Sequence, residues 1–204
     1  MRRMKKGERM FIVVGLPGAG KSTVLSKIKE EGYDVINYGD IMFELCKERY
    51  NITSRDEMRR LGREEYVKLQ KTAARTISAR AGEDTIIDTH AVVFTVDGYI
   101  PGLPYEILKE FSNVTHIILI SAPYKDIVRR REMDKAIRKR DLLTEDEFER
   151  QSAITLSLVS AYAFFTGAHV VIIENADGML AVSYTHLRAH ETRHDLVCRL
   201  LLEK

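Results

Sequence analysis

The sequence predicts an α/β protein built on one doubly wound, five-stranded parallel sheet with helices on both faces. Short, almost continuously apolar runs recur along the chain, as in strands that are buried on both faces of a sheet. Segments with helical periodicity separate these runs, and this alternation is typical of parallel strands joined by right-handed crossover helices. The predicted strands are residues 10–14, 35–38, 85–88, 116–120 and 169–173.

Capping signals position the helices between these strands. The first predicted helix begins in the glycine-rich stretch after the first strand and ends near Glu31. The stretch SRDE, at 54–57, has the pattern of a capping box and predicts the start of a long helical stretch that reaches about Ala81. The stretch TEDE, at 144–147, repeats the pattern before a helix expected to end near Gly167.

Composition indicates one domain without a membrane span. The chain has 204 residues, enough for one core, and its net charge of +2 gives no broad attraction to nucleic acid or to a membrane surface. Cys46 and Cys198 fit no metal or redox spacing, which suits a reducing compartment. The apolar run near the N-terminus is too short for a signal peptide, and none approaches the roughly 18 residues of a membrane helix. We therefore predict a cytoplasmic protein.

The most specific motif follows the first strand directly. The stretch GLPGAGKST fits the pattern G-x-x-x-x-G-K-[ST], in which glycines allow backbone amides to surround a phosphate. The N-terminus of the following helix adds a partial positive charge. Because a strand precedes the motif and a helix follows it, we predict a nucleoside triphosphate site. Its predicted ATP-binding residues are Gly15, Leu16, Pro17, Gly18, Ala19, Gly20, Lys21, Ser22 and Thr23.

Two further residues are predicted to hold Mg²⁺ beside this loop. The Ser22 hydroxyl is the loop's metal ligand in the motif, and Asp88 ends a neighbouring apolar strand, where its carboxylate would bind the ion directly or through water. Capping of the next turn is the alternative use of Asp88. Lys21 is predicted to act on the transferred phosphate. The absence of an N-K-x-D motif and of a long insertion favours a small-molecule kinase over a GTPase or a motor-type ATPase.

Six further stretches follow the phosphate loop, up to about Leu180: NYGDIMFE, SRDEMRRL, DTHAVV, GYIPGLP, RKRD and NADG. In these stretches and their order, the chain resembles the archaeal-type adenylate kinase family. The resemblance implies a P-loop nucleoside monophosphate kinase fold with a short lid, the Mg²⁺-dependent reaction of ATP with AMP to give two ADP, and a trimer. It also implies a kinase domain over 1–180, with an AMP-binding region at about 39–81 and the lid at about 124–143.

The resemblance also selects candidate acceptor residues. Arg59 matches an arginine of the family, and its planar guanidinium suits bidentate contact with the AMP phosphate, although a solvated helix face is the alternative. His90 lies two residues after Asp88 and would share its side if the strand continued; a structural histidine is the alternative. The loop containing Gly102 would approach adenine, or is a plain turn. Gly39, expected at the edge of the sheet before a helix, would let the backbone approach the nucleotide. The predicted AMP-binding residues are Gly39, Arg59, His90 and Gly102.

The densest charge of the chain lies in the predicted lid. The stretch RRREMDKAIRKRD, at 129–141, holds seven cations. Such a run is often a solvated helix face, but phosphoryl transfer requires positive charge around the phosphate and exclusion of water. With Lys21, the predicted catalytic residues are Arg130, Arg138 and Arg140. No general base is predicted, because positioning and charge neutralisation carry this chemistry. Without a cysteine quartet, we expect no structural zinc.

The last segment departs from the family pattern. Residues 181–204 contain His186, His190 and His194 at helical i,i+4 spacing, but the segment resembles translated sequencing-adapter read-through, and we assign it no function. Three other functions stay open: another nucleoside monophosphate kinase, a small-metabolite kinase of the shikimate type, or a nucleotide-binding regulatory ATPase. Arg59, the GYIPGLP loop and the lid arginines distinguish the adenylate kinase from these alternatives, because simple ATP binding needs none of them.

Overall fold

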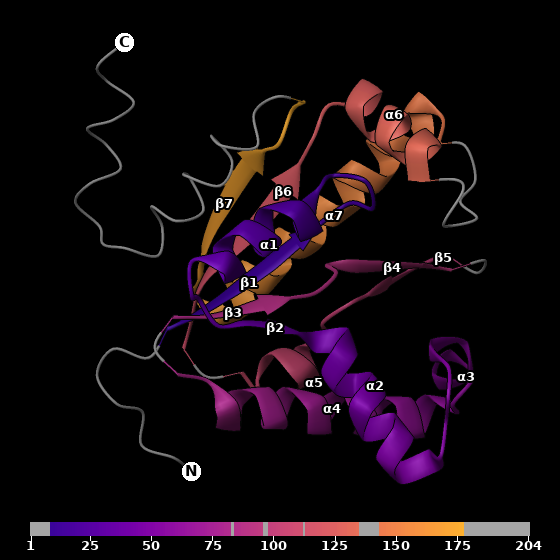
Figure 1. The fold of residues 1–204 in the computed structure, drawn as a ribbon, viewed down its shortest axis with the longest axis vertical. Coiled ribbons are helices and arrows are strands. Elements are labelled where there is room, and N and C mark those ends of the chain that lie inside the picture. Colours follow the sequence, from indigo (N-terminus) through magenta and orange to yellow (C-terminus); the bar gives the residue numbers. More distant parts are fainter. Residues whose placement is uncertain (1–8, 83, 96–97, 112, 135–142, 178–204) are drawn as a thin grey trace.

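The protein is built around the expected five-stranded parallel sheet (Figure 1). The computed structural model describes residues 9–82, 84–95, 98–111, 113–134 and 143–177. The strand order is β2-β3-β1-β6-β7, so the phosphate-loop strand β1 is central. The strands are β1 (Met10–Gly15), β2 (Val35–Asn37), β3 (Thr85–Asp88), β6 (Val114–Ser121) and β7 (His169–Glu174). All five predicted strands are therefore confirmed, and β6 is longer than expected. The expected burial on both faces is wrong for the edge strand β7, in which Val170 and Ile172 are 39% and 54% exposed.

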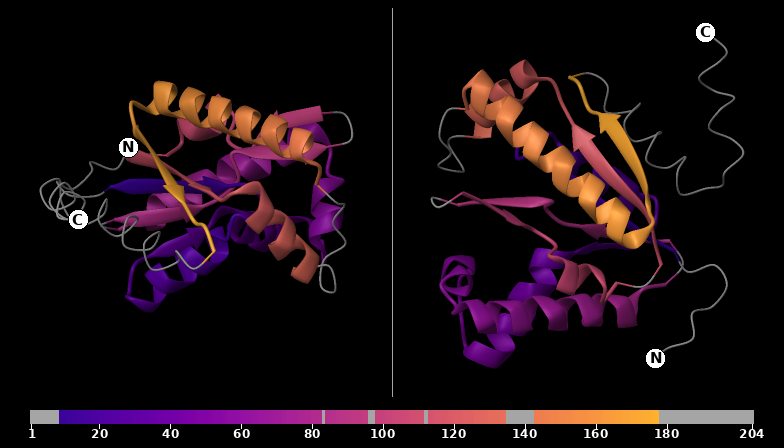
Figure 2. Two further views of the ribbon diagram at one scale, coloured as in Figure 1. Left: turned by 90° about the horizontal axis from the view of Figure 1, so that it is seen from above. Right: turned by 180° about the vertical axis from the view of Figure 1, so that it is seen from behind.

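Consecutive side chains of β1 point to opposite faces of the sheet, so the strand contributes to two cores, and helices cover both. Phe11 and Val13 pack in a core beneath α1 (Lys21–Glu30), whereas Ile12 and Val14 pack on the other face. That second core includes side chains from α2 (Tyr38–Tyr50), α4 (Arg63–Arg80) and α7 (Glu145–Thr166). Figure 2 shows α7 running across this face. All four of these β1 side chains are completely buried, and each such burial contributes about 1.5–3 kcal/mol.

The helical stretch expected over 54–81 is divided, which corrects that prediction. The short helix α3 (Arg55–Arg59) ends before α4 begins, and Gly62, with an extended conformation, precedes the first residue of α4. Glycine is a poor helix former, and a new helix start here places Glu64 and Glu65 in the first turn of α4, where the helix dipole favours negative charge.

The two predicted capping boxes differ. At α3, the Ser54 hydroxyl accepts a hydrogen bond from the Glu57 amide, but the Glu57 carboxylate accepts one from the Thr53 amide instead of the Ser54 amide. This box is half formed. At α7, Thr144 and Glu147 form both reciprocal bonds, and the helix ends at Gly167, which has a φ of +71°. The second prediction is confirmed.

An antiparallel hairpin, which the sequence did not predict, follows β3. It consists of β4 (Val92–Thr95) and β5 (Gly98–Pro101), and it extends between α6 (Tyr124–Asp134) and α3 (Figure 1). The remaining helix, α5 (Tyr105–Leu108), follows the hairpin. None of the helices in the described parts of the chain is long and apolar enough to span a membrane. The segment 181–204, for which we expected an atypical tail, lies outside the described residues.

Candidate active site

The phosphate loop connects β1 to α1, and its glycines are required by geometry. Gly18 and Gly20 have φ values of +96° and +81°, which favour residues without a Cβ atom. A Cβ atom on Gly15 would lie 2.6 Å from the carbonyl oxygen of Ile120, so β1 and β6 approach too closely for a side chain there. Gly20 is also the N-cap of α1 and has no side chain to cap it, so first-turn amides stay available to an anion.

Lys21 and Asp88 meet at the carboxyl ends of adjacent strands. The Lys21 ammonium forms an ion pair with the Asp88 carboxylate and donates a hydrogen bond to the carbonyl oxygen of Thr89 at 2.6 Å. Lys21 is only 9% exposed, and this burial lowers the pKa of its ammonium, while the charge of Asp88 opposes the decrease. The structure thus brings together the residues predicted to act on phosphate and metal.

Asn37 holds the other oxygen of the same carboxylate. Its side-chain amide donates a hydrogen bond to Oδ2 of Asp88 at 2.7 Å, whereas Lys21 contacts Oδ1. Asn37 is the last residue of β2 and lies beside Asp88 in the strand register. No role was predicted for this residue. Its only signal in the sequence was its position near the end of the strand predicted at 35–38.

The NADG stretch braces the phosphate loop, although sequence reasoning gave it no role. The Asn175 side chain is buried and donates a hydrogen bond to the carbonyl oxygen of Ala19 at 3.0 Å. The Asn175 backbone amide bonds to the carbonyl oxygen of Ser121 at 2.8 Å, which fixes this residue to the end of β6. A Cβ atom on Gly20 would lie 2.3 Å from Asn175 Nδ2, so the two segments touch directly.

Arg130, from α6, lies against this brace. Its guanidinium donates to the carbonyl oxygen of Asn175 at 2.8 Å and to that of Gly18 at 3.4 Å. It also forms two bonds with Asp177, at 2.8 and 3.0 Å, and Arg129 pairs with the same carboxylate. The structure therefore places one predicted lid arginine at the phosphate loop. Arg138 and Arg140, the other two predicted lid arginines, lie outside the described residues.

We expect Asp177→Asn to lower the melting temperature by a few degrees at neutral pH. Desolvation raises the pKa of Asp177, but hydrogen bonds and charge from Arg130 and Arg129 outweigh it and lower the pKa overall. A lowered native pKa stabilises the fold above the unfolded value of about 3.9, and this contribution disappears as the pH falls through the native pKa. Thermal unfolding should therefore show a difference between variant and wild type that closes in acid. A difference that persists at the lowest pH would contradict the ion-pair origin.

The acceptor candidates lie on a different set of elements. Gly39 is the second residue of α2, inside the first turn and not before the helix as expected. β3 ends at Asp88, so the strand does not continue to His90, which is exposed. A Cβ atom on Gly102 would lie 1.9 Å from the carbonyl oxygen of His90, so these two candidates are in backbone contact. The backbone of Arg59 ends α3, and its side chain lies outside the described part of the structure.

A buried tyrosine closes the base of the hairpin beside Gly102. The Tyr162 hydroxyl donates a hydrogen bond to the carbonyl oxygen of Ala91 at 2.5 Å and accepts one from the amide of Leu103 at 3.2 Å. Burial raises the pKa of Tyr162 to about 12, so the hydroxyl keeps its proton at neutral pH. Tyr162, near the carboxyl end of α7, was not identified from the sequence.

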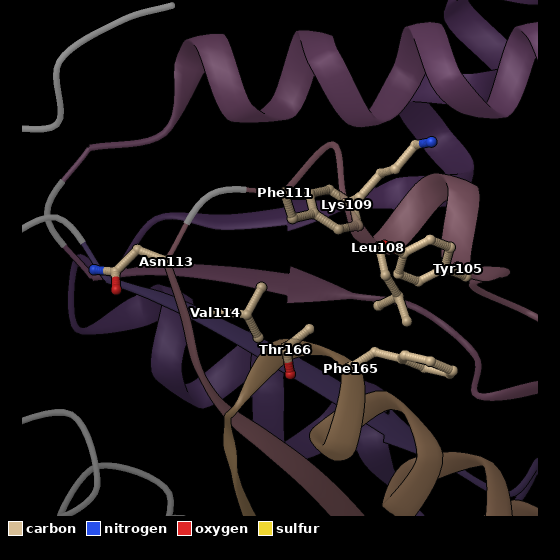
Figure 3. Close-up of a pocket in the computed structure, with 8 residues that line it drawn as sticks. All are labelled: Tyr105, Leu108, Lys109, Phe111, Asn113, Val114, Phe165 and Thr166. Carbon is tan, nitrogen blue, oxygen red and sulfur yellow. The ribbon is translucent and has the colours of Figure 1, made fainter.

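A pocket of about 270 Å³ lies away from this site (Figure 3). Tyr105 and Leu108 of α5 and Phe165 of α7 line it, together with Val114, the first residue of β6. It is therefore at the amino-terminal edge of the sheet, whereas the phosphate loop follows the carboxyl end of β1. Ligands of open α/β sheets bind at the carboxyl edge. We therefore do not assign this pocket to the active site.

Comparisons with known proteins identify relatives of this chain. A protein-family model described as an AAA domain matches residues 14–149. The chain is 40% identical over 168 residues to an adenylate kinase of Thermoplasma acidophilum, covering 82% of this chain and 90% of that protein. It is 41% identical over 175 residues to an adenylate kinase of Methanopyrus kandleri, covering 84% and 91%.

Solved structures show the same fold at much lower identity. Shikimate kinase from Bacteroides thetaiotaomicron superposes with a TM-score of 0.53 at 14% identity, covering 89% of this chain and 97% of that one. Shikimate kinase from Acinetobacter baumannii, solved with shikimate, gives 0.53 at 17% identity, covering 90% and 93%. At these identities the likeness concerns the fold alone.

Proposed function

The chain belongs to the adenylate kinase family and is a phosphotransferase, and we propose here how its residues convert ATP and AMP into two ADP. The family resemblance predicted from the sequence is thereby confirmed. The observation that carries the proposal is the buried contact between Lys21 and Asp88 under the first turn of α1. It places a fixed cation and a carboxylate at the carboxyl edge of the sheet, next to a loop of phosphate-binding geometry.

In this proposal, Lys21 stabilises the charge on the transferred phosphate. The loop 15–23 binds the ATP phosphates through backbone amides and the N-terminus of α1, and Lys21 exchanges Asp88 for a phosphate oxygen. Charge stabilisation of this kind is the main catalytic contribution in phosphoryl transfer, so no general base is needed. Burial favours the role, because a charge in a site of low dielectric acts more strongly than in water.

We propose that Ser22 and Asp88 hold Mg²⁺, which neutralises phosphate charge when bound. Both offer oxygen atoms, the ligands that Mg²⁺ prefers, and Mg²⁺ in such sites takes its other ligands from phosphates and water. Within the described residues, no cluster of three or more His, Cys, Asp or Glu side chains could hold a metal ion alone. One carboxylate and one hydroxyl next to the phosphate loop therefore fit an ion that arrives with the nucleotide.

The lid and the acceptor region complete the proposal. Arg130 supports a lid at about 124–143, because it already contacts the phosphate loop at Gly18; Arg138 and Arg140 are assigned by the family pattern alone. For AMP we propose a region at about 39–81 and the residues Gly39, Arg59, His90 and Gly102. We also propose a cytoplasmic trimer that acts on free nucleotides: the trimer is implied by the family resemblance alone, and the compartment by the composition of the chain.

A coupled assay of ADP formation tests the reaction. ATP and Mg²⁺ are supplied with AMP, CMP, UMP or GMP in turn, and we expect the highest kcat/KM with AMP. A preference for another monophosphate would assign the chain to a different nucleoside monophosphate kinase. Turnover of ATP with none of the four, but with a small hydroxylated acid such as shikimate, would support the small-metabolite alternative.

Replacing Arg59 with alanine tests the acceptor site. If its guanidinium binds the AMP phosphate, the loss should weaken AMP binding by about 1.5–3 kcal/mol, the usual contribution of a charged hydrogen bond, with little change for ATP. The KM for each nucleotide measures this effect. Arg60→Ala is the matched control, since Arg60 is the adjacent exposed residue that caps α3. An unchanged KM for AMP in Arg59→Ala would instead support the alternative that Arg59 only lies on a solvated helix face.

A further inference from the structure

We infer that Asn37 is a positioning residue that fixes the Asp88 carboxylate and connects it to the first turn of α2. The inference rests on the proposed roles of Lys21 and Asp88 and extends them to a residue outside the phosphate loop. Its basis is a chain of contacts from α1 to α2, in which the two oxygens of Asp88 are held from opposite sides.

Both polar atoms of the Asn37 side chain are in use. Nδ2 donates to Oδ2 of Asp88 at 2.7 Å, and Oδ1 accepts a hydrogen bond from the backbone amide of Asp40 at 3.0 Å. The second bond makes Asn37 the N-cap of α2. A side chain bonded at both ends cannot rotate without losing one bond. The position of Asp88 is therefore tied to the start of a helix in the proposed AMP-binding region.

The identity of the residue supports a role beyond capping. Asparagine, aspartate and serine cap helices about equally well, so capping alone does not select asparagine. An aspartate at position 37 would have no hydrogen to donate and would repel Asp88, whereas a serine carries one polar atom on a shorter side chain. Of the three residues, only asparagine carries the acceptor for the Asp40 amide and the donor for the carboxylate on two separate atoms.

The consequence for the reaction follows from the exchange of partners by Lys21. When Lys21 moves to a phosphate oxygen, Oδ1 of Asp88 loses its partner in the protein. Asn37 still holds Oδ2, so the carboxylate keeps its orientation, and Oδ1 stays directed at the phosphate loop. Without the amide, the carboxylate turns about its last torsion, for which the preference is broad. Its contribution to a bound cation then decreases.

The chain of contacts continues past α2 but becomes weak there. The Asp40 carboxylate pairs with Arg55 of α3, yet these side chains are 55% and 49% exposed. Exposed ion pairs contribute little to stability. The positioning effect therefore belongs to Asn37 and the first turn of α2, and Arg55 is not part of it.

Two variants of Asn37 and one control test the inference. Asn37→Ser keeps the cap but removes the amide donor, and Asn37→Asp keeps the shape and the cap but has no donor. Ser54→Ala is the matched control, because Ser54 caps α3 in the same region. For each protein, calorimetry measures ATP binding with and without Mg²⁺, and thermal unfolding reports stability. Steady-state rates then separate kcat from the KM of AMP.

We expect Mg²⁺ to strengthen ATP binding less in both Asn37 variants, by about 10-fold, the effect of losing one charged hydrogen bond. Binding of ATP without Mg²⁺ should change little, and kcat should fall with an almost constant KM for AMP. Asn37→Ser should melt somewhat below wild type, because it keeps the cap of α2 but loses the bond to the Asp88 carboxylate. Ser54→Ala should lose stability and keep the full effect of Mg²⁺.

Three results would overturn the inference: an unchanged Mg²⁺ effect in Asn37→Ser, a loss confined to Asn37→Asp, which would indicate repulsion alone, or an equal loss in Ser54→Ala. Failure of the proposed reaction is distinguishable. If the wild type bound ATP with Mg²⁺ but formed no ADP from AMP, the reaction would be wrong, and the binding comparison would still decide the role of Asn37.

Discussion

Lys21→Ala is expected to lower kcat by on the order of 10²-fold or more, the loss typical of removing one charge-stabilising group in the transition state. ATP binding should weaken only modestly, because the loop amides and the N-terminus of α1 still hold the phosphates. The reason for the asymmetry is that Lys21 is a buried cation at the proposed site of transfer, where charge increases as the reaction proceeds. Steady-state kinetics and equilibrium ATP binding measure the two effects separately.

Lys27→Ala provides the control for this variant. Lys27 lies on the same helix, is about half exposed and pairs only locally, with Glu30, so its loss should leave kcat unchanged. Thermal unfolding must accompany the kinetics, because Lys21→Ala leaves the mostly buried Asp88 carboxylate without its cation, although Asn37 still bonds to it. Near-normal turnover in a folded Lys21→Ala protein would contradict the assignment of this loop as the phosphate-binding site.

The main sheet could be predicted because local sequence determines it. Each of its strands is a short apolar run bounded by polar or glycine residues, so the strands can be inferred without knowing their neighbours. Burial on both faces could not be inferred for the edge strand β7, because an apolar run does not show whether another element covers it. The hairpin β4–β5 could not be inferred in this way. Gly98, Pro101 and Gly102 gave its second half the composition of a loop, and Tyr99 and Ile100 stay exposed, so no buried face marked it as a strand.

The same distinction between local and long-range information decides which site residues could be predicted from the sequence. Lys21 was predictable because it is part of the phosphate-loop motif, and Asp88 because it ends a predicted strand beside that loop. Asn37, Asn175 and Tyr162 were not, because each acts on a residue far away in the chain. Their partners are Asp88, Ala19 and Ala91, at separations of 51, 156 and 71 positions. An asparagine or a tyrosine is ordinary at its own position, and only the fold shows what it contacts.

Gly102→Ala is expected to destabilise the protein by about 3 kcal/mol or more, in the range of substitutions that force a shift of packed backbone. The added Cβ atom would lie 1.9 Å from the carbonyl oxygen of His90 and 2.9 Å from its carbon. These are backbone atoms, so no side-chain rotation relieves the clash. The movement would also disturb the bond from the Gly102 amide to the carbonyl oxygen of Ala91, at 2.8 Å, and the contacts of Tyr162 at the hairpin base.

The same substitution should raise the KM for AMP more than the KM for ATP, because the hairpin base carries two proposed acceptor residues, while the phosphate loop lies on other elements. Denaturant unfolding and steady-state kinetics measure the two effects. Gly82→Ala is the matched control, since a Cβ atom there meets no atom within 4 Å. It should be neutral or slightly stabilising, because alanine restricts the unfolded chain. Equal stability of the two variants would show that the backbone at Gly102 can move without cost, and the hairpin base would then not be the rigid support that the acceptor site requires.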